Sequence, residues 1–146
     1  MSQTAYTVYP AEAYAGQLIP DVPFTIESRV ATANLPFGRG VQRVTSDNQV
    51  GLTAASGVPQ GVAIITHENP NDQAEDILTG QNVSVLKKGR VWVEAVGAVT
   101  QGASAYAIVT VGATQGKFTA TVGSNLLVGK YVTGGTDTLV LLDVDL

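Results

Sequence analysis

Apolar and polar residues alternate along much of the chain from residue 23 onward, and this period of two is typical of half-buried β-strands. In the segment 23–30, Phe24 and Ile26 fall on one face and Glu27 falls on the other. The run 58–66 is largely apolar, which predicts a strand buried on both faces. Further strands are expected at 37–44, 49–53, 82–86, 91–96, 104–111, 117–122, 126–133 and 138–144.

Turn residues separate these segments. Glycines lie between or beside most of them, and residues 46–49 have the composition of a tight turn. The segment Lys87-Lys88-Gly89-Arg90 is expected to be the tip of a hairpin between 82–86 and 91–96. Strands recur about every 8–12 residues without a long amphipathic helix between them, which disfavours a parallel α/β sheet. The chain is therefore predicted to be mainly β, a compact antiparallel β-barrel or β-sandwich of about nine or ten short strands with an extended N-terminal arm.

Residues 67–80 interrupt the strand pattern. Asn69-Pro70-Asn71-Asp72 is rich in turn residues, and the stretch 68–76 is acidic. We expect a surface loop with one helical turn near 73–78. Glu75 and Asp76 could hold a cation, but calcium requires more oxygen ligands at closer spacing. A solvated acidic loop is the preferred interpretation, and no metal site is predicted.

Residues 1–22 differ in composition from the rest of the chain. They contain Tyr6, Tyr9 and Tyr14, three of the five tyrosines, and Pro10 is placed to begin a short helix. Two interpretations are open. One is a disordered terminus, which is common at chain ends, and the other is an arm whose aromatic side chains pack on another molecule.

The composition excludes several classes of function. Eight basic residues against twelve acidic ones give a net charge of −4, which argues against binding of nucleic acid or of an acidic membrane surface. The chain has no cysteine, so the fold needs no disulfide or thiolate metal site. The first residues lack the basic and apolar regions of a signal peptide, so we expect a protein that is made and kept in a cytoplasm, or assembled there.

Catalytic chemistry is poorly represented. His67 is the single histidine, and a working triad or metal site needs partners that the sequence does not supply. There is no nucleophile elbow, no phosphate-binding loop and no dinucleotide fingerprint. We therefore predict that the chain is not an enzyme, has no catalytic residues and needs no cofactor.

Two features of the predicted hairpin are candidates for an interface. The densest basic patch consists of Lys87, Lys88 and Arg90. A solvated turn is the preferred interpretation of this patch, and a docking site for an acidic partner surface is the alternative. Trp92 is the single tryptophan and shares one strand face with Glu94. A place in the core is the preferred interpretation of Trp92, and an exposed interface anchor is the alternative.

Several short segments follow one another in an order that resembles the structural cement proteins of tailed phages. The resemblance covers most of the chain, and its most specific parts are the Pro-Phe-Gly-Arg segment at 36–39 and the Lys-Gly-Arg-Val-Trp-Val-Glu segment at 88–94. The remaining parts are Ala15-Gly16, Ile26-Glu27-Ser28-Arg29, Gly61-Val62-Ala63, His67, Ala98-Val99, Gly102, Tyr106 and Gly116-Lys117-Phe118.

This resemblance implies a protein that binds the outer face of an assembled shell of major capsid proteins and braces it against the pressure of packaged DNA. It implies oligomers, commonly dimers or trimers, located on the virion and in the host cytoplasm during assembly. We divide the chain into an arm at 1–22 and a β-rich cement domain at 23–146. The candidate capsid or oligomer contacts are Tyr6, Tyr9, Tyr14, Leu18, Ile19, Lys87, Lys88, Arg90 and Trp92.

Two competing hypotheses come from other classes of protein. A β-sandwich that binds carbohydrate or a host surface would need clustered exposed aromatics, and one tryptophan with three phenylalanines make a thin platform. An enzyme built around His67 and the nearby acidic residues would lose its turnover on substitution of that histidine.

Overall fold

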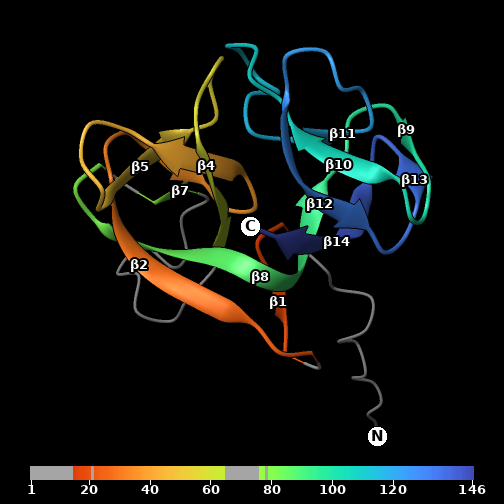
Figure 1. Cartoon of the computed structure of the whole chain (residues 1–146), viewed down its shortest axis with the longest axis horizontal. Helices are drawn as coiled ribbons and strands as arrows, with labels where there is room; N and C mark the ends of the chain where they lie inside the picture. Colours follow the sequence, from red (N-terminus) through yellow and green to blue (C-terminus); the bar gives the residue numbers. More distant parts are fainter. Residues whose placement is uncertain (1–14, 21, 65–75, 78) are drawn as a thin grey trace, which may run out of the picture.

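The computed structural model describes residues 15–20, 22–64, 76–77 and 79–146 of the 146-residue chain. Within these residues there are fourteen β-strands and no helix (Figure 1). The prediction of a mainly β fold is confirmed. The longer strands are β2 (Thr25–Ala31), β4 (Gly40–Arg43), β5 (Gln49–Leu52), β6 (Pro59–Ile64), β8 (Asn82–Glu94), β10 (Ser104–Ala107), β12 (Leu126–Tyr131) and β14 (Leu139–Asp145).

The remaining strands are each two residues long, which raises the total above the nine or ten that the sequence pattern predicts. Strands this short form because of tertiary contacts, and the alternation of two residues is too short to predict a strand from the sequence. They are β1 (Leu18–Ile19), β3 (Leu35–Pro36), β7 (Asp76–Ile77), β9 (Ala98–Val99), β11 (Phe118–Thr119) and β13 (Gly135–Thr136).

Five strands close into a barrel, in the order β8–β2–β5–β4–β6 and back to β8. Among the described strands, the pairing of β2 with β5 is the one parallel pairing, and all others are antiparallel. Closure leaves no free edge within the ring, which removes a route to aggregation. The barrel encloses a small apolar core formed by Ala31, Leu35, Val41, Val50, Ala63, Ile77, Val83 and Val85.

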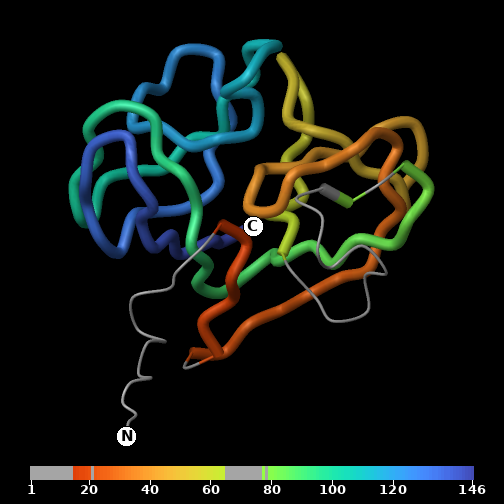
Figure 2. The backbone as a smooth tube through the Cα atoms, turned by 180° about the vertical axis from the view of Figure 1, so that it is seen from behind, coloured from red at the N-terminus to blue at the C-terminus, as the bar shows by residue number. Residues whose placement is uncertain are grey.

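A second group of strands lies beside the barrel, as Figure 2 shows from behind. Here the sheet continues from β8 through β14, β12 and β10 to β11. Its inner face covers a larger apolar core. That core contains Val62, Ile64, Leu86, Val91, Val93, Ala95, Val99, Ala105, Ala107, Phe118, Val128, Tyr131, Val140, Leu142 and Val144.

Strand β6 separates the two cores. Val62 and Ile64 face the larger core, while Ala63 between them faces the barrel interior. All three side chains are at most 2% exposed. The prediction of a strand buried on both faces in this part of the chain is therefore confirmed, because each alternate residue has an apolar core to enter.

The predicted hairpin at 87–90 is wrong. Residues 82–94 form the single strand β8, with β2 and β1 on one edge and β6 and β14 on the other. Lys88 pairs with both Thr25 and Asp145, so the basic residues lie inside a ladder and the solvated-turn interpretation also fails. Gly89, with φ of +131°, lets Phe24 approach to a distance that a Cβ atom would block. The glycine therefore serves close packing and a bend, which local composition cannot distinguish from a turn.

The predicted helical turn near 73–78 is wrong where the structure describes it. Asp76 and Ile77 form β7, which pairs antiparallel with β3. Ile77 is 1% exposed and packs in the barrel core. The predicted turn at 46–49 is confirmed, since the Gln49 amide donates to the Ser46 carbonyl at 3.1 Å. The short helix proposed after Pro10 lies outside the described residues.

Gly61 offers a test of how tightly β6 approaches β8. Its φ is +145°, and an added Cβ would lie 2.1 Å from the carbonyl oxygen of Leu86. We predict that Gly61→Ala lowers the free energy of unfolding by about 3–4 kcal/mol, from strained backbone and overpacking together. Urea denaturation measures the loss.

The matched control is Gly102→Ala. Gly102 also has positive φ, +85°, but an added Cβ would meet nothing within 4 Å. This variant should lose only about 1–2 kcal/mol from its left-handed backbone. Equal losses of unfolding free energy in the two variants would show that the close contact between β6 and β8 does not contribute to stability.

Candidate functional site

The sheet formed by β1, β8, β14, β12 and β10 has one face turned away from the larger core. Val91 and Val93 of β8 point into the core, so Arg90 and Trp92 point away from it. Side chains of directly paired residues lie on the same side of a sheet. The register of the neighbouring strands therefore places one residue from each of them in a row with Arg90. We call this surface the outer sheet face; its central row is Ile19, Arg90, Asp143, Lys130 and Ser104.

The outer sheet face combines apolar and charged side chains. Trp92 is half-buried and pairs with Leu141 of β14. On the other side of the central row, the Lys88 ammonium lies 2.9 Å from the Asp145 carboxylate. A shallow groove of about 320 Å³ runs along the face beside this ion pair. It is lined by Ser104, Leu127, Gly129, Lys130, Asp143 and Asp145.

The structure brings together four residues that the sequence singles out as interface candidates. Ile19, Lys88, Arg90 and Trp92 all fall on the outer sheet face by register. The prediction that Trp92 lies in the core is wrong, because Val91, Val93 and Ala95 occupy the core side of β8 instead. Whether any of the four contacts a partner stays a prediction.

Two other candidates point elsewhere, and three lie outside the described residues. Leu18 is half-buried and packs against the larger core. Lys87 turns to the opposite side of β8 from Lys88, where its ammonium lies 3.9 Å from Glu27. Glu27 also pairs with Arg29. Tyr6, Tyr9 and Tyr14 belong to the part of the chain that the structure does not describe.

Residues 15–19 fasten the root of the predicted arm to the sheet. The Gly16 amide donates to the Trp92 carbonyl at 2.8 Å, and the Trp92 amide donates to the Gln17 carbonyl at 3.1 Å. Gly38, with φ of +79°, lies so close that an added Cβ would be 2.6 Å from the Cβ of Ala15. Sequence reasoning missed this anchor, since its only signals are isolated glycines far apart in the chain. One consequence is that β1, inside the predicted arm at 1–22, is part of the β body.

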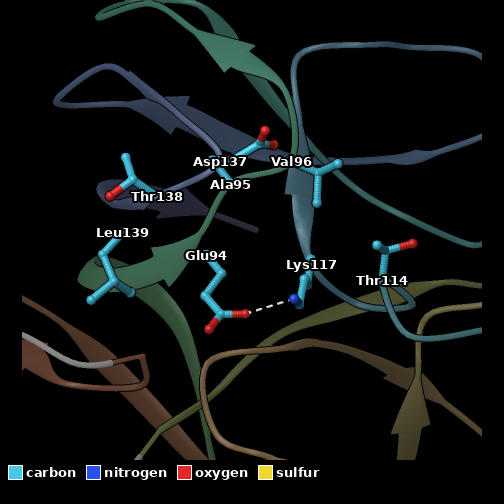
Figure 3. A pocket seen from close by; sticks show the side chains of 8 residues that line it. All are labelled: Glu94, Ala95, Val96, Thr114, Lys117, Asp137, Thr138 and Leu139. Atoms are coloured by element: carbon cyan, nitrogen blue, oxygen red, sulfur yellow. Dashed lines mark ion pairs between the residues drawn. The ribbon is translucent and has the colours of Figure 1, made fainter.

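A second groove, of about 340 Å³, shows no catalytic arrangement (Figure 3). The Lys117 ammonium and the Glu94 carboxylate neutralise each other at 2.9 Å. The Asp137 carboxylate accepts a hydrogen bond from the Gly97 amide at 2.6 Å, which is a structural use of that side chain. A nucleophile with a base beside it is not found among these lining residues.

Burial raises the pKa of the Tyr131 hydroxyl, which belongs to the larger core and is 2% exposed. Among the residues that the structure describes, no three histidine, cysteine or acidic side chains cluster closely enough to bind a metal ion. The candidate histidine, His67, and Glu75 lie outside those residues. In the described part of the chain, no helix has the length and apolar character needed to span a membrane.

Solved structures of two phage proteins share this fold. A chain from the capsid of Myoviridae phage XM1 superposes with a TM-score of 0.74 at 20% sequence identity, covering 90% of this chain and 89% of that one. The head fibre gp8.5 N base of bacteriophage phi29 gives a TM-score of 0.54 at 16% identity, covering 84% of this chain and 95% of that one. At these identities the likeness shows a common architecture. No curated protein matches the chain in sequence.

The class of the protein follows from a family model that matches residues 1–144, nearly the whole chain: it is a structural protein of phages. The chain belongs to the structural cement protein family, described by E217 gp24 and Pam3 gp6. The resemblance noted from the sequence is thereby confirmed. Membership implies a place in the virion, association with capsid proteins and a role without catalysis.

The Lys88–Asp145 pair gives a test of the electrostatics of the outer sheet face. The hydrogen bond from Lys88, and then its positive charge, hold the pKa of Asp145 below the ordinary value of 3.8. A lowered pKa means that the pair stabilises the folded chain above about pH 4, and that this contribution is lost as pH falls through the folded-state value.

We predict that Lys88→Met moves the pKa of Asp145 back toward 3.8, while Lys88→Arg keeps it low. Carboxyl carbon shifts followed by NMR during a pH titration measure both. A pKa of Asp145 that does not respond to Lys88→Met would show that the two groups do not interact in solution.

Proposed function

We propose that this protein binds the outer surface of an assembled phage capsid and stabilises contacts between major capsid protein subunits. The observation that carries the proposal is the match of the structural cement protein family over residues 1–144. The fold is consistent with such a role, because shared strands join two apolar cores into one body.

The outer sheet face is the surface that best suits a contact with the shell. It presents the flat aromatic area of Trp92 and the apolar side chain of Leu141 beside a row of mixed charges. Tryptophan and arginine are enriched among the residues that dominate binding energy at interfaces. The central row alternates in charge from Arg90 to Asp143 to Lys130. Such a row fixes the orientation of the protein on a complementary surface and does not attract every acidic surface.

The proposed mechanism is stabilisation of the assembled shell by mass action. A ligand that binds the assembled shell more tightly than free subunits stabilises the shell by the difference in binding free energy. Repetition over a symmetric lattice adds avidity to a modest single contact, since each further contact of a linked oligomer is intramolecular. We infer that the chain acts as a dimer or trimer, on the outer face of the virion, after assembly in the host cytoplasm.

The N-terminal segment is the second proposed contact. Its three tyrosines offer roughly 150–250 Å² of area each, a large share of the roughly 800 Å² that one partner buries in a specific interface. We predict that removal of residues 1–14 leaves a folded body that no longer sediments with purified shells. The truncation ends before Gly16 because the Gly16 amide and β1 belong to the sheet.

The unfolding transition of this truncated chain, followed by circular dichroism, serves as the control for folding. A truncated chain that still sediments with shells at the affinity of the whole chain would remove the N-terminal segment from the contact, leaving the outer sheet face as the only proposed one.

Trp92 tests the outer sheet face itself. We predict that Trp92→Ala weakens shell binding by about 30-fold or more, the effect of losing about 2 kcal/mol at a dominant interface residue. Val44→Ala is the matched control, since Val44 is 36% exposed at the turn between β4 and β5 and lies outside this face. Binding isotherms with purified shells measure both; equal affinities would exclude the outer sheet face as the docking surface.

A further inference from the structure

Residues 15–19, drawn in red in Figure 2, contact two separate parts of the body. We call these residues the strap. On one side the strap lies alongside Trp92, with which it exchanges two backbone hydrogen bonds. On its other side it contacts Gly38, which belongs to the Pro-Phe-Gly-Arg segment at 36–39. That segment is among the most specific motifs of the sequence, and neither proposed contact region gives it a role.

Gly38 leaves a space that the strap fills. Its φ of +79° lies in the left-handed region, which favours glycine. An added Cβ would be 2.6 Å from the Cβ of Ala15 and 2.7 Å from the nitrogen of Gly16. Both distances are far below van der Waals contact, so one of the two segments must move if residue 38 acquires a side chain.

The Gly38 side of this contact is held more firmly than the strap. The Gly38 amide donates to the Ala63 carbonyl at 2.7 Å, and the Ala63 amide donates to the Arg39 carbonyl at 3.0 Å. Ala63 is fully buried in the barrel core. The Arg39 guanidinium donates to the Gln115 carbonyl at 2.7 Å, which ties the segment to the second group of strands as well. The strap, in contrast, is held through the two-residue strand β1 and the side chain of Leu18. A side chain at residue 38 therefore displaces the strap.

Displacement of the strap reaches Trp92 directly. The Trp92 amide donates to the Gln17 carbonyl at 3.1 Å, and the Trp92 carbonyl accepts from the Gly16 amide at 2.8 Å. Without the strap, both backbone groups would face water at the edge of β8, where a strand opens more easily. On the other edge of β8, Trp92 pairs with Leu141. The strap and β14 together therefore define the position of Trp92 on the outer sheet face.

We propose that Gly38 is a positioning residue for the outer sheet face: it receives the strap, and the strap holds Trp92 in the position that contacts the shell. A surface that is fixed before binding loses less conformational entropy when a partner covers it. The same contact fixes Ala15, to which the N-terminal segment is attached. This inference rests on the proposed function for its effect on shells, whereas the position of the strap can be measured on the chain alone.

Gly38→Ala is the test variant, and Gly97→Ala is its matched control. Both glycines have a φ of +79°, but an added Cβ at Gly97 would meet nothing within 4 Å. The two substitutions therefore carry the same cost of a left-handed backbone and differ in the collision with the strap. Unfolding transitions followed by circular dichroism check that both variants are folded.

Trp92 reports the position of the strap in two ways. It is the single tryptophan of the chain, so fluorescence emission reports this one place. We expect Gly38→Ala to shift the emission to longer wavelength, because water reaches the indole ring, and to speed hydrogen exchange of the Trp92 amide by at least about tenfold. Gly97→Ala should leave both unchanged. The Tyr131 amide, which donates to the Ala103 carbonyl at 3.0 Å, is the internal reference for exchange in all variants.

Gly16→Pro loosens the strap from its other side. Proline has no amide hydrogen to donate to the Trp92 carbonyl, and it cannot adopt the φ of +89° found at Gly16. This variant should give the same changes in emission and exchange with Gly38 intact. Binding isotherms with purified shells should show about tenfold lower affinity for Gly16→Pro and Gly38→Ala, and unchanged affinity for Gly97→Ala.

The outcomes separate this inference from the proposed function. A Gly38→Ala chain with the emission and Trp92 amide exchange of Gly97→Ala overturns the inference without any use of shells. If Gly38→Ala does not fold, a Gly16→Pro chain that keeps full affinity for shells overturns it. Both Trp92 changes with unaltered shell affinity also overturn it and leave the proposed function standing. An unsubstituted chain without affinity for shells contradicts the proposed function instead, and the Trp92 measurements then still decide whether Gly38 positions the strap.

Discussion

Strand β8 is the element on which the rest of the structure depends. Its first half belongs to the closed barrel, and its second half pairs with β1 and β14. Both of its edges therefore have paired strands. Val83 and Val85 enter the barrel core, whereas Leu86, Val91 and Val93 enter the larger core. Leu86 and Val91 face the same core although they are five residues apart, so the alternation of sides is interrupted between them, where the register of β8 against β2 shifts. One strand therefore joins two hydrophobic cores into one body.

This arrangement explains where interaction surfaces can arise. With both cores closed, side chains that carry affinity must lie on faces the cores do not use. Trp92 is on such a face because Val91 and Val93 have taken the core side of β8.

The sequence predicted the strand-rich class, most of the longer strands and the doubly buried run of β6, because period-two alternation and unbroken apolar runs are local signals. It failed at 87–90, where glycine and three basic residues have turn composition but the segment is held by partners on both sides. It also failed at 76–77, because a two-residue strand is created by its partner β3.

The site was predictable in part. Ile19, Lys88, Arg90 and Trp92 were identified by residue type, but their common face depends on the register of β1 and β14 against β8, which no local pattern reveals. The anchoring of Ala15 and Gly16 against Gly38 was missed for the same reason, because it is a contact between segments far apart in sequence.

An electron-microscopy reconstruction of capsid shells incubated with the purified chain tests the central claim most directly. The account predicts density on the outer surface of the shell that fits the β body, with Trp92 and Arg90 of the outer sheet face against the major capsid protein. Shells without added density, or density that contacts the capsid protein through the barrel side alone, would contradict it.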